Sequence, residues 1–261
     1  MTRRALPLYA AAVYLFLHLP LAILLVFSFN RSKFTVWEGF SLDWYVAAFR
    51  DSQLGEATWN SLIIATVATV CATIAGTLCA YGLWKRGSAW LAGSLYLSLI
   101  TPEIVTGISL LAFFQWMFRY VNVQLGMYTV ILAHIAFSIV YVVIVVMARL
   151  RSLDRSLEEA ALDLGARDWQ AFSYVTLPQL WPAVGAAALL VFTISFDDYI
   201  ITSMVAGIDS ETLPMVVYAM ARRGANPVVN AISALITIGL GILILVSEKL
   251  RSEERRVGKE C

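Results

Sequence analysis

The chain has 261 residues, of which 60% are hydrophobic and only 14% are charged, and its formal net charge is +1. Soluble domains carry about 25% charged residues, so the composition excludes an ordinary soluble domain and predicts a membrane protein. The net charge identifies no partner by itself. We expect the lipid bilayer around the chain and no nucleic acid.

Six apolar segments are long enough to cross about 30 Å of hydrocarbon as helices, which takes about twenty residues. In chain order they are residues 8–29, 60–83, 91–118, 126–148, 181–206 and 229–247. The segments are continuously apolar rather than alternating, which predicts an all-α membrane protein with six transmembrane helices and not a β-barrel. Glu103 interrupts the third segment, and Asp197 with Asp198 interrupts the fifth.

The orientation follows from the lysines and arginines between the segments, which concentrate on the cytoplasmic side of membranes. More of them lie inside when the N-terminus is placed in the cytoplasm. This arrangement predicts that both termini are cytoplasmic. We expect one six-helix transmembrane domain over residues 1–250, and a charged tail over residues 251–261 that is either a solvated end or a non-native remnant.

Motifs for catalysis are missing from the sequence. It contains no phosphate-binding G-x-x-x-x-G-K-[ST] stretch, no nucleophile triad and no cluster with metal-ligand spacing. His18 and His134 are isolated in apolar segments, where we expect structural roles. The chain is therefore predicted not to be an enzyme, to bind no metal or cofactor, and to leave ATP and Mg²⁺ to another subunit if ATP drives its function.

The segment "SLEEAALDLGARDWQAFSYVTLP", residues 156–178, is polar although long apolar stretches flank it. Ser156 and Glu159 have the spacing of a capping box, which predicts a helix over 157–164. Gly165 suits the left-handed residue after a helix, Asp168 begins a second helix, and Pro178 ends that helix. An acidic surface is unsuited to an anionic leaflet, so we expect this cytoplasmic loop, about 152–178, to contact a protein.

Within this loop, the pattern Glu159-Ala160-Ala161-x3-Gly165-x9-Val175-x-Leu177-Pro178 resembles the EAA loop of ABC-importer permeases, with valine in place of isoleucine. The resemblance implies the type I importer fold and a coupling helix that docks on a cytoplasmic ATPase. It implies a complex with a second homologous permease, two ATPase subunits and an external substrate-binding protein in a bacterial inner membrane. The residues implied in ATPase coupling are Glu158, Glu159, Ala160, Ala161, Gly165, Leu177 and Pro178.

Further stretches, among them "SFNRSKFTVWEGFSLDWY", "TPEIVTGISLL" and "SFDDYIITSMVAG", are similar to the C-type permeases of spermidine/putrescine importers. This resemblance implies half of a translocation pathway for a polyamine. Related permeases for iron, phosphonates or amino-acid-like solutes remain an alternative. A self-sufficient transporter driven by ions is a second alternative, although such proteins often contain inverted repeats and the sequence has no visible repeat.

Candidate pathway residues come from the acidic positions in the third and fifth segments. Carboxylates at membrane depth are costly and usually face a cavity or a partner, and aromatic rings can bind the cation by cation–π contacts. We therefore predict a substrate pathway along Glu103, Phe196, Asp197, Asp198 and Tyr199. Two adjacent acids point about 100° apart on a helix, so one can line the pathway while the other meets a neighbouring helix or the partner permease. Pro102 and Gly107 loosen the helix near Glu103, either for packing or for gating.

Overall fold

The computed structural model describes residues 2–34, 36–120, 124–224, 227–239 and 241–242. Within these residues the fold consists of helices and one isolated antiparallel bridge, between Asn30 and Phe40, with no strand. The prediction of an all-α protein is therefore confirmed. The chain divides into two compact units, one from Met1–Glu56 with Val216–Cys261 and the other from Ala57–Met215.

The first unit contains the predicted first membrane helix. Helix α1 (Thr2–Phe27) includes 22 residues, Leu6–Phe27, that are apolar enough to cross a membrane. Helix α2 (Asp43–Arg50) follows it, and a shorter apolar helix spans Pro227–Gly239. The predicted sixth segment, 229–247, extends past the described residues, and the tail 251–261 lies outside them.

The loop between α1 and α2 is built around the buried side chain of Asn30, which is 2% exposed. Its Oδ1 accepts a hydrogen bond from the Glu38 N–H at 3.0 Å, and its Nδ2 donates to the Val36 carbonyl at 2.8 Å. The Asn30 carbonyl accepts from the Trp44 indole N–H of α2 at 2.7 Å. One asparagine thus satisfies backbone groups that the loop would otherwise bury without partners.

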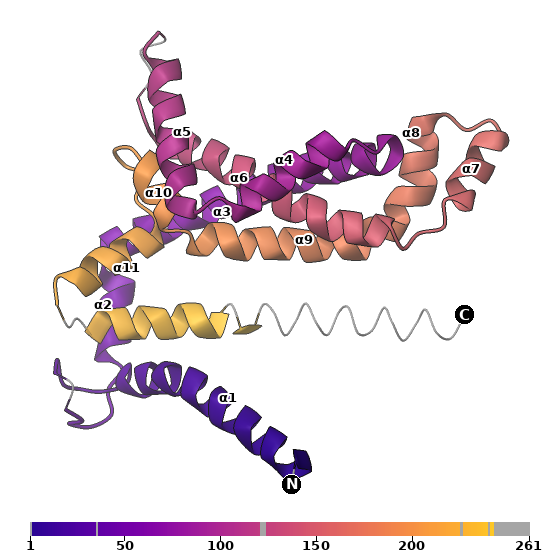
Figure 1. Cartoon of the computed structure of the whole chain (residues 1–261). Coiled ribbons are helices and arrows are strands. Elements are labelled where there is room, and N and C mark those ends of the chain that lie inside the picture. Colours follow the sequence, from indigo (N-terminus) through magenta and orange to yellow (C-terminus); the bar gives the residue numbers. More distant parts are fainter. Residues whose placement is uncertain (1, 35, 121–123, 225–226, 240, 243–261) are drawn as a thin grey trace. The chain divides into compact units, whose positions relative to one another are not determined.

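Three long helices form the core of the second unit: α3 (Ser52–Arg86), α6 (Met127–Leu150) and α9 (Leu177–Asp197). Buried residues from all three meet in one apolar cluster, and α6 and α9 run side by side (Figure 1). Small residues bring α3 close to α6, because a Cβ atom on Gly76 would lie 2.6 Å from Cβ of Val142. Such small-residue contacts are typical of helix pairs in membranes.

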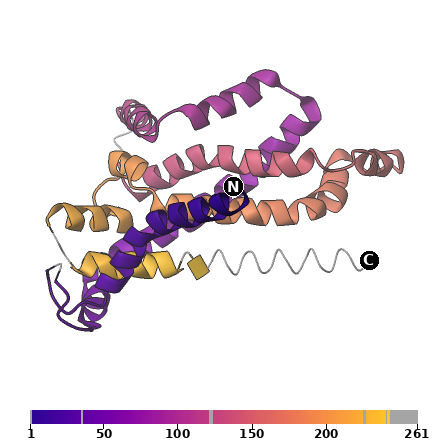
Figure 2. The ribbon, with the colours of Figure 1, turned by 60° about the horizontal axis from the view of Figure 1, so that its bottom comes forward.

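The third predicted segment is broken and does not form one helix. The chain direction bends by 109° between helices α4 (Ala89–Ile100) and α5 (Glu103–Phe118), and the break lies at Thr101 and Pro102. Pro102 therefore does more than loosen a helix, since the residue before a proline is disfavoured in the α region and the chain turns there. Helix α4 contacts α6 on the side away from α9 (Figure 2).

The fifth predicted segment also departs from a single helix over 181–206. The helix that carries it begins earlier and includes residues Asp168–Asp197, and it ends at the acidic pair. A short helix, α10 (Ile200–Val205), follows, and α11 (Leu213–Arg222) comes next. In the described residues, four helices are long and apolar enough to cross a membrane, or five if α4 and α5 form one bent span. The predicted count of six is not reached in this part of the chain.

Candidate functional site

The polar segment after α6 begins with helix α7 (Ser156–Asp163). The predicted capping box is wrong, because Ser156 is already the first helical residue and Arg155, which precedes it, provides no side-chain cap. Asp154 takes this role instead, and its Oδ1 accepts a hydrogen bond from the Ser156 N–H at 2.9 Å. This bond lowers the pKa of the Asp154 carboxyl.

The end of α7 agrees with the prediction for Gly165, which has a φ of +91°. The Gly165 N–H donates to the Leu162 carbonyl at 2.9 Å, and the Ala166 N–H donates to the Ala161 carbonyl at 3.0 Å. This pair of bonds is the Schellman motif, which favours glycine at the left-handed position. Apart from Gly165 itself and its two chain neighbours, no residue has an atom within 4 Å of a Cβ built on Gly165. The glycine is therefore required by its backbone conformation and not by crowding.

Glu158 fixes α7 to the rest of the second unit. The residue is 4% exposed, and its carboxylate contacts side chains from α3 and from the chain before α9. Tyr81 donates to Oε1 at 2.7 Å, the Lys85 ammonium lies 2.9 Å from Oε1, and Thr176 donates to Oε2 at 2.7 Å. Burial by itself would raise the pKa of Glu158, but the hydrogen bonds from Lys85, Tyr81 and Thr176 outweigh it and lower that pKa.

Further contacts join the same two parts of the chain. The Arg155 guanidinium lies over the Trp84 ring, 4.6 Å from its centroid, and donates to the Trp84 carbonyl at 2.8 Å. The Lys85 ammonium also lies 2.7 Å from Oδ1 of Asp168. Sequence reasoning missed these anchors, since no local spacing relates the end of α3 to residues about seventy positions later.

Pro178 does not end the second short helix, contrary to the prediction. Helix α8 (Asp168–Ala171) starts at the predicted residue, but it continues through a π-helical turn, Phe172–Thr176, into α9. The Leu177 N–H donates to the Phe172 carbonyl, five residues back. Pro178 has no N–H to donate, so the helix continues past it without that backbone bond. The π-helical turn thus connects the loop to the long helix by continuous helical backbone.

Residues 156–178, which we call the α7 segment, also present an exposed surface. Glu159 and Ala160 are exposed, whereas Ala161 and Leu177 are half-buried. Leu164 is 90% exposed and Trp169 is 66% exposed. The segment therefore combines an internal anchor, Glu158, with an exposed surface of small and apolar side chains. A surface of this kind is suited to a protein partner.

A second candidate site lies where two helices are interrupted. The α4–α5 break and the α9–α10 break line the same cavity, which has a volume of about 650 Å³. Four of the five residues predicted for the pathway, Glu103, Asp197, Asp198 and Tyr199, line this cavity. Non-helical backbone at membrane depth is tolerated where it lines a cavity, and broken helices bind substrates in many transporters.

Phe196 does not belong with these residues. It is absent from the cavity lining and stacks on Phe192, one helical turn earlier in α9, with ring centroids 6.0 Å apart. The prediction places residues 196–199 together on the substrate pathway, but the helix ends at Asp197 and the chain then changes direction. Gly107 has a packing role, since a Cβ atom there would lie 3.2 Å from Met204.

The two acidic neighbours have different surroundings. Oδ2 of Asp198 accepts hydrogen bonds from the Thr202 N–H and hydroxyl, both at 2.8 Å, and lies 3.5 Å from Nε2 of His134 in α6. Asp197 is exposed to the cavity and has no hydrogen-bond partner among the described residues. Both acids line the cavity, but Asp198 is bonded to Thr202 and lies beside His134 of α6, whereas Asp197 is exposed. A helix end and not a helical turn separates them.

His134 completes the polar network around Asp198. Its Nδ1 lies 2.6 Å from the Ser195 hydroxyl and its Nε2 lies 2.9 Å from the Thr202 hydroxyl. Both ring nitrogens have partners, which agrees with the structural role expected for this histidine. Among the described residues, no group of three histidine, cysteine or acidic side chains is placed to hold a metal ion.

Comparison with known proteins identifies the family of the chain. The model of the family described as "Binding-protein-dependent transport system inner membrane component" matches residues 72–250. The chain belongs to this family. The match includes the α7 segment and both helix breaks, so the predicted importer family is confirmed and the chain is a multi-pass membrane protein of a transport system. A transport component of this family is not an enzyme.

Individual members of this transport family resemble the chain over most of its length. The putrescine transport system permease protein PotI of Escherichia coli K12 is 41% identical over 94% of this chain and 90% of that protein. The spermidine/putrescine transport system permease protein PotC of the same strain is 34% identical over 96% of this chain and 94% of that protein.

Solved structures share the fold. A bacterial ABC transporter that imports the acidic polysaccharide alginate matches with a TM-score of 0.71 and 17% identity, over 95% of this chain and 98% of that chain. A bacterial alginate ABC transporter in complex with a periplasmic protein that binds an alginate pentasaccharide matches with a TM-score of 0.70 and 17% identity, over 98% of this chain and 96% of that chain. At this identity the likeness shows the importer-permease fold and nothing about the substrate.

Proposed function

We propose that this chain is one of the two membrane-spanning subunits of an ATP-driven polyamine importer. It forms half of the pathway, with a second homologous permease, two cytoplasmic ATPase subunits and an external binding protein. Six spans cross the inner membrane with both termini in the cytoplasm. ATP and Mg²⁺ are bound by the ATPase subunits.

The observation that carries the proposal is the acidic cavity at the two helix breaks, in a chain 41% identical to a putrescine permease. Putrescine and spermidine are flexible chains that carry ammonium groups. Carboxylates attract those groups, and aromatic rings bind cations and cover methylene chains. Glu103 and Asp197 supply the carboxylates, and Tyr141 and Tyr199 line the same cavity.

Reconstitution tests the function and separates it from the alternatives. We expect proteoliposomes with the complete importer and its binding protein to take up labelled putrescine or spermidine when ATP is supplied. Liposomes with this chain alone should take up neither, even with an ion gradient. Gradient-driven uptake by the single chain would support the secondary transporter instead. ATP-driven uptake of iron or a phosphonate, but of no polyamine, would reject the proposed substrate.

Coupling to the ATPase rests on the α7 segment. We expect Gly165→Val to place a β-branched residue at a φ of +91°, at a cost of about 2 kcal/mol. This variant should insert and assemble but lose most ATP-driven uptake, because α7 no longer ends in the same direction. Ala160→Trp, on the exposed surface, should have the same effect by blocking the joint. The measurement is uptake per ATP hydrolysed by purified complexes.

The matched controls are Gly165→Asn and Ala160→Ser. Asparagine tolerates the left-handed conformation, and the space around Gly165 is open, so Gly165→Asn should couple nearly normally. Serine adds only a hydroxyl to Ala160 and should also be tolerated. Normal coupling in both Gly165→Val and Ala160→Trp would show that α7 does not transmit the ATPase movement.

A further inference from the structure

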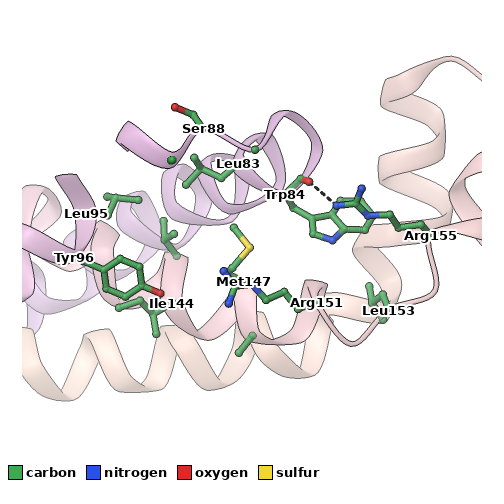
Figure 3. Close-up of a pocket in the computed structure, with 14 residues that line it drawn as sticks. Leu83, Trp84, Ser88, Leu95, Tyr96, Ile144, Met147, Arg151, Leu153 and Arg155 are labelled. Carbon is green, nitrogen blue, oxygen red and sulfur yellow. Dashed lines mark hydrogen bonds between the residues drawn. The ribbon is translucent and has the colours of Figure 1, made fainter. Parts of the chain in front are cut away.

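A second cavity, of about 720 Å³, lies away from the acidic one, where α3 ends and α6 leads towards α7. Its wall is formed by the end of α3, the start of α4, the last turns of α6 and the chain before α7 (Figure 3). Most of the lining is apolar, with Leu83, Leu95, Ile144, Met147 and Leu153 among its residues. None of the predicted pathway residues belongs to it.

The charges in this cavity have a single sign. Arg151 and Arg155 line it, and no acidic side chain does so among the described residues. The Arg151 side chain reaches alongside Met147 into the cavity (Figure 3) and has no hydrogen-bond or ion-pair partner in the described chain. Arg155 uses one guanidinium nitrogen to bind the Trp84 carbonyl.

An apolar wall that ends in unneutralised arginines is complementary to a phospholipid, which has apolar acyl chains and an anionic headgroup. A free inorganic anion would leave the apolar wall uncovered, and an uncharged acyl chain would leave Arg151 unpaired. Basic pockets between membrane helices on the cytoplasmic side bind anionic headgroups, and a guanidinium fork matches a phosphate. Tyr96 adds a phenol at the apolar end of the cavity.

We propose that this cavity binds an anionic phospholipid of the leaflet on the α7 side. Arg151 contacts the headgroup phosphate, and the acyl chains lie along Leu95, Ile144 and Met147. The inference rests on the proposed orientation of the permease in its membrane, but not on the identity of its substrate. The lipid would lie beside Trp84 and Arg155, the pair that helps to hold α7 to α3. Its binding therefore stabilises the loop that contacts the ATPase.

The test compares Arg151→Gln with Arg86→Gln in the assembled importer. Arg86 is exposed near the end of α3 and does not line the cavity, so its loss removes the same charge at a neighbouring place. Native mass spectrometry of complexes titrated with phosphatidylglycerol measures bound lipid. We expect Arg151→Gln to weaken this binding about tenfold, and Arg86→Gln to bind as the unchanged protein does.

A functional readout accompanies the binding measurement. In nanodiscs, raising phosphatidylglycerol in phosphatidylcholine should increase ATP hydrolysis severalfold in the unchanged importer and in Arg86→Gln, and much less in Arg151→Gln. Equal lipid binding by the three proteins would overturn the proposal. So would a photocrosslinker at Tyr96 that labels the partner permease and not lipid, because another subunit would then fill the cavity. Lipid binding is measured without transport, so an incorrect substrate assignment would leave this result unaffected.

Discussion

Lys85→Met is expected to destabilise the importer and uncouple it, because it leaves the buried Glu158 carboxylate without its cation. Removing one partner of a buried ion pair costs about 3–5 kcal/mol. The Lys85 side chain is 31% exposed and Tyr81 and Thr176 still donate to the carboxylate, so we expect a loss of about 2 kcal/mol. Thermal unfolding of the purified complex and uptake per ATP hydrolysed would measure the two effects.

Asp168→Asn is the matched control, since Asp168 binds the same ammonium with a side chain that is 82% exposed. Exposed pairs contribute about 0–1 kcal/mol, so this variant should remain close to the unchanged protein. The double variant Lys85→Met with Glu158→Leu should recover part of the lost stability, because it leaves no unpaired buried charge. The recovery is incomplete because the Tyr81 and Thr176 hydroxyls lose their acceptor. Equal stability of Lys85→Met and Asp168→Asn would contradict an anchoring role for Glu158.

The same anchor predicts a pH dependence. Because folding lowers the pKa of Glu158 below its ordinary value of 4.5, ionised Glu158 stabilises the folded protein above that value. The stabilisation is lost as the pH falls below 4.5 and through the lower pKa of the folded state. Glu158→Gln should weaken this part of the acid sensitivity, and unfolding temperatures between neutral pH and pH 3 would show the difference.

Local signals in the sequence were sufficient for the corner inside the segment 156–178, but not for its two ends. Gly165 and Asp168 mark a helix end and a helix start through backbone chemistry that involves only neighbouring residues. The capping box failed because Asp154, two positions before Ser156, competes for the same amide. Pro178 was misread because a π-helical turn can carry a helix past a proline, and side-chain types do not reveal such a turn.

Long-range contacts account for the remaining differences. The acidic residues of 156–178 all appeared available to a partner, but Glu158 is buried against Tyr81 and Lys85 of α3, 77 and 73 positions away. Nothing within the segment separates it from the exposed Glu159. Likewise, the apolar composition of 91–118 and 181–206 predicted continuous helices. Pro102 with Glu103 in one segment and the pair Asp197–Asp198 in the other were local signs of the breaks, but they did not show that both breaks lie beside one cavity.

These breaks also separate the two acids of the fifth segment into different roles. Asp198 caps the start of α10 and lies beside His134, and its side chain is 7% exposed. Asp197 is exposed to the cavity that Glu103 and Tyr199 also line. A polyamine ammonium in that cavity can therefore reach Asp197 without disturbing an existing bond. Asp198 would first have to release Thr202 and His134.

We therefore expect Asp197→Asn to lower the efficiency of polyamine uptake about tenfold, which corresponds to about 1.4 kcal/mol of lost attraction. Its thermal stability and its association with the binding protein should stay unchanged, since Asp197 has no partner in the described chain to lose.

Asp198→Asn is the matched substitution one residue later. An asparagine oxygen caps a helix about as well as aspartate does, so this variant should keep the bonds from Thr202 and lose the attraction to His134 and the longer bond from the Ile201 N–H. It should be less stable by about 1 kcal/mol and transport normally per assembled complex. Uptake kinetics over a range of spermidine concentrations, normalised to assembled importer, distinguish the two variants. Normal uptake by Asp197→Asn, or a transport loss in Asp198→Asn that exceeds its loss of assembled complex, would contradict this division between a pathway residue and a structural one.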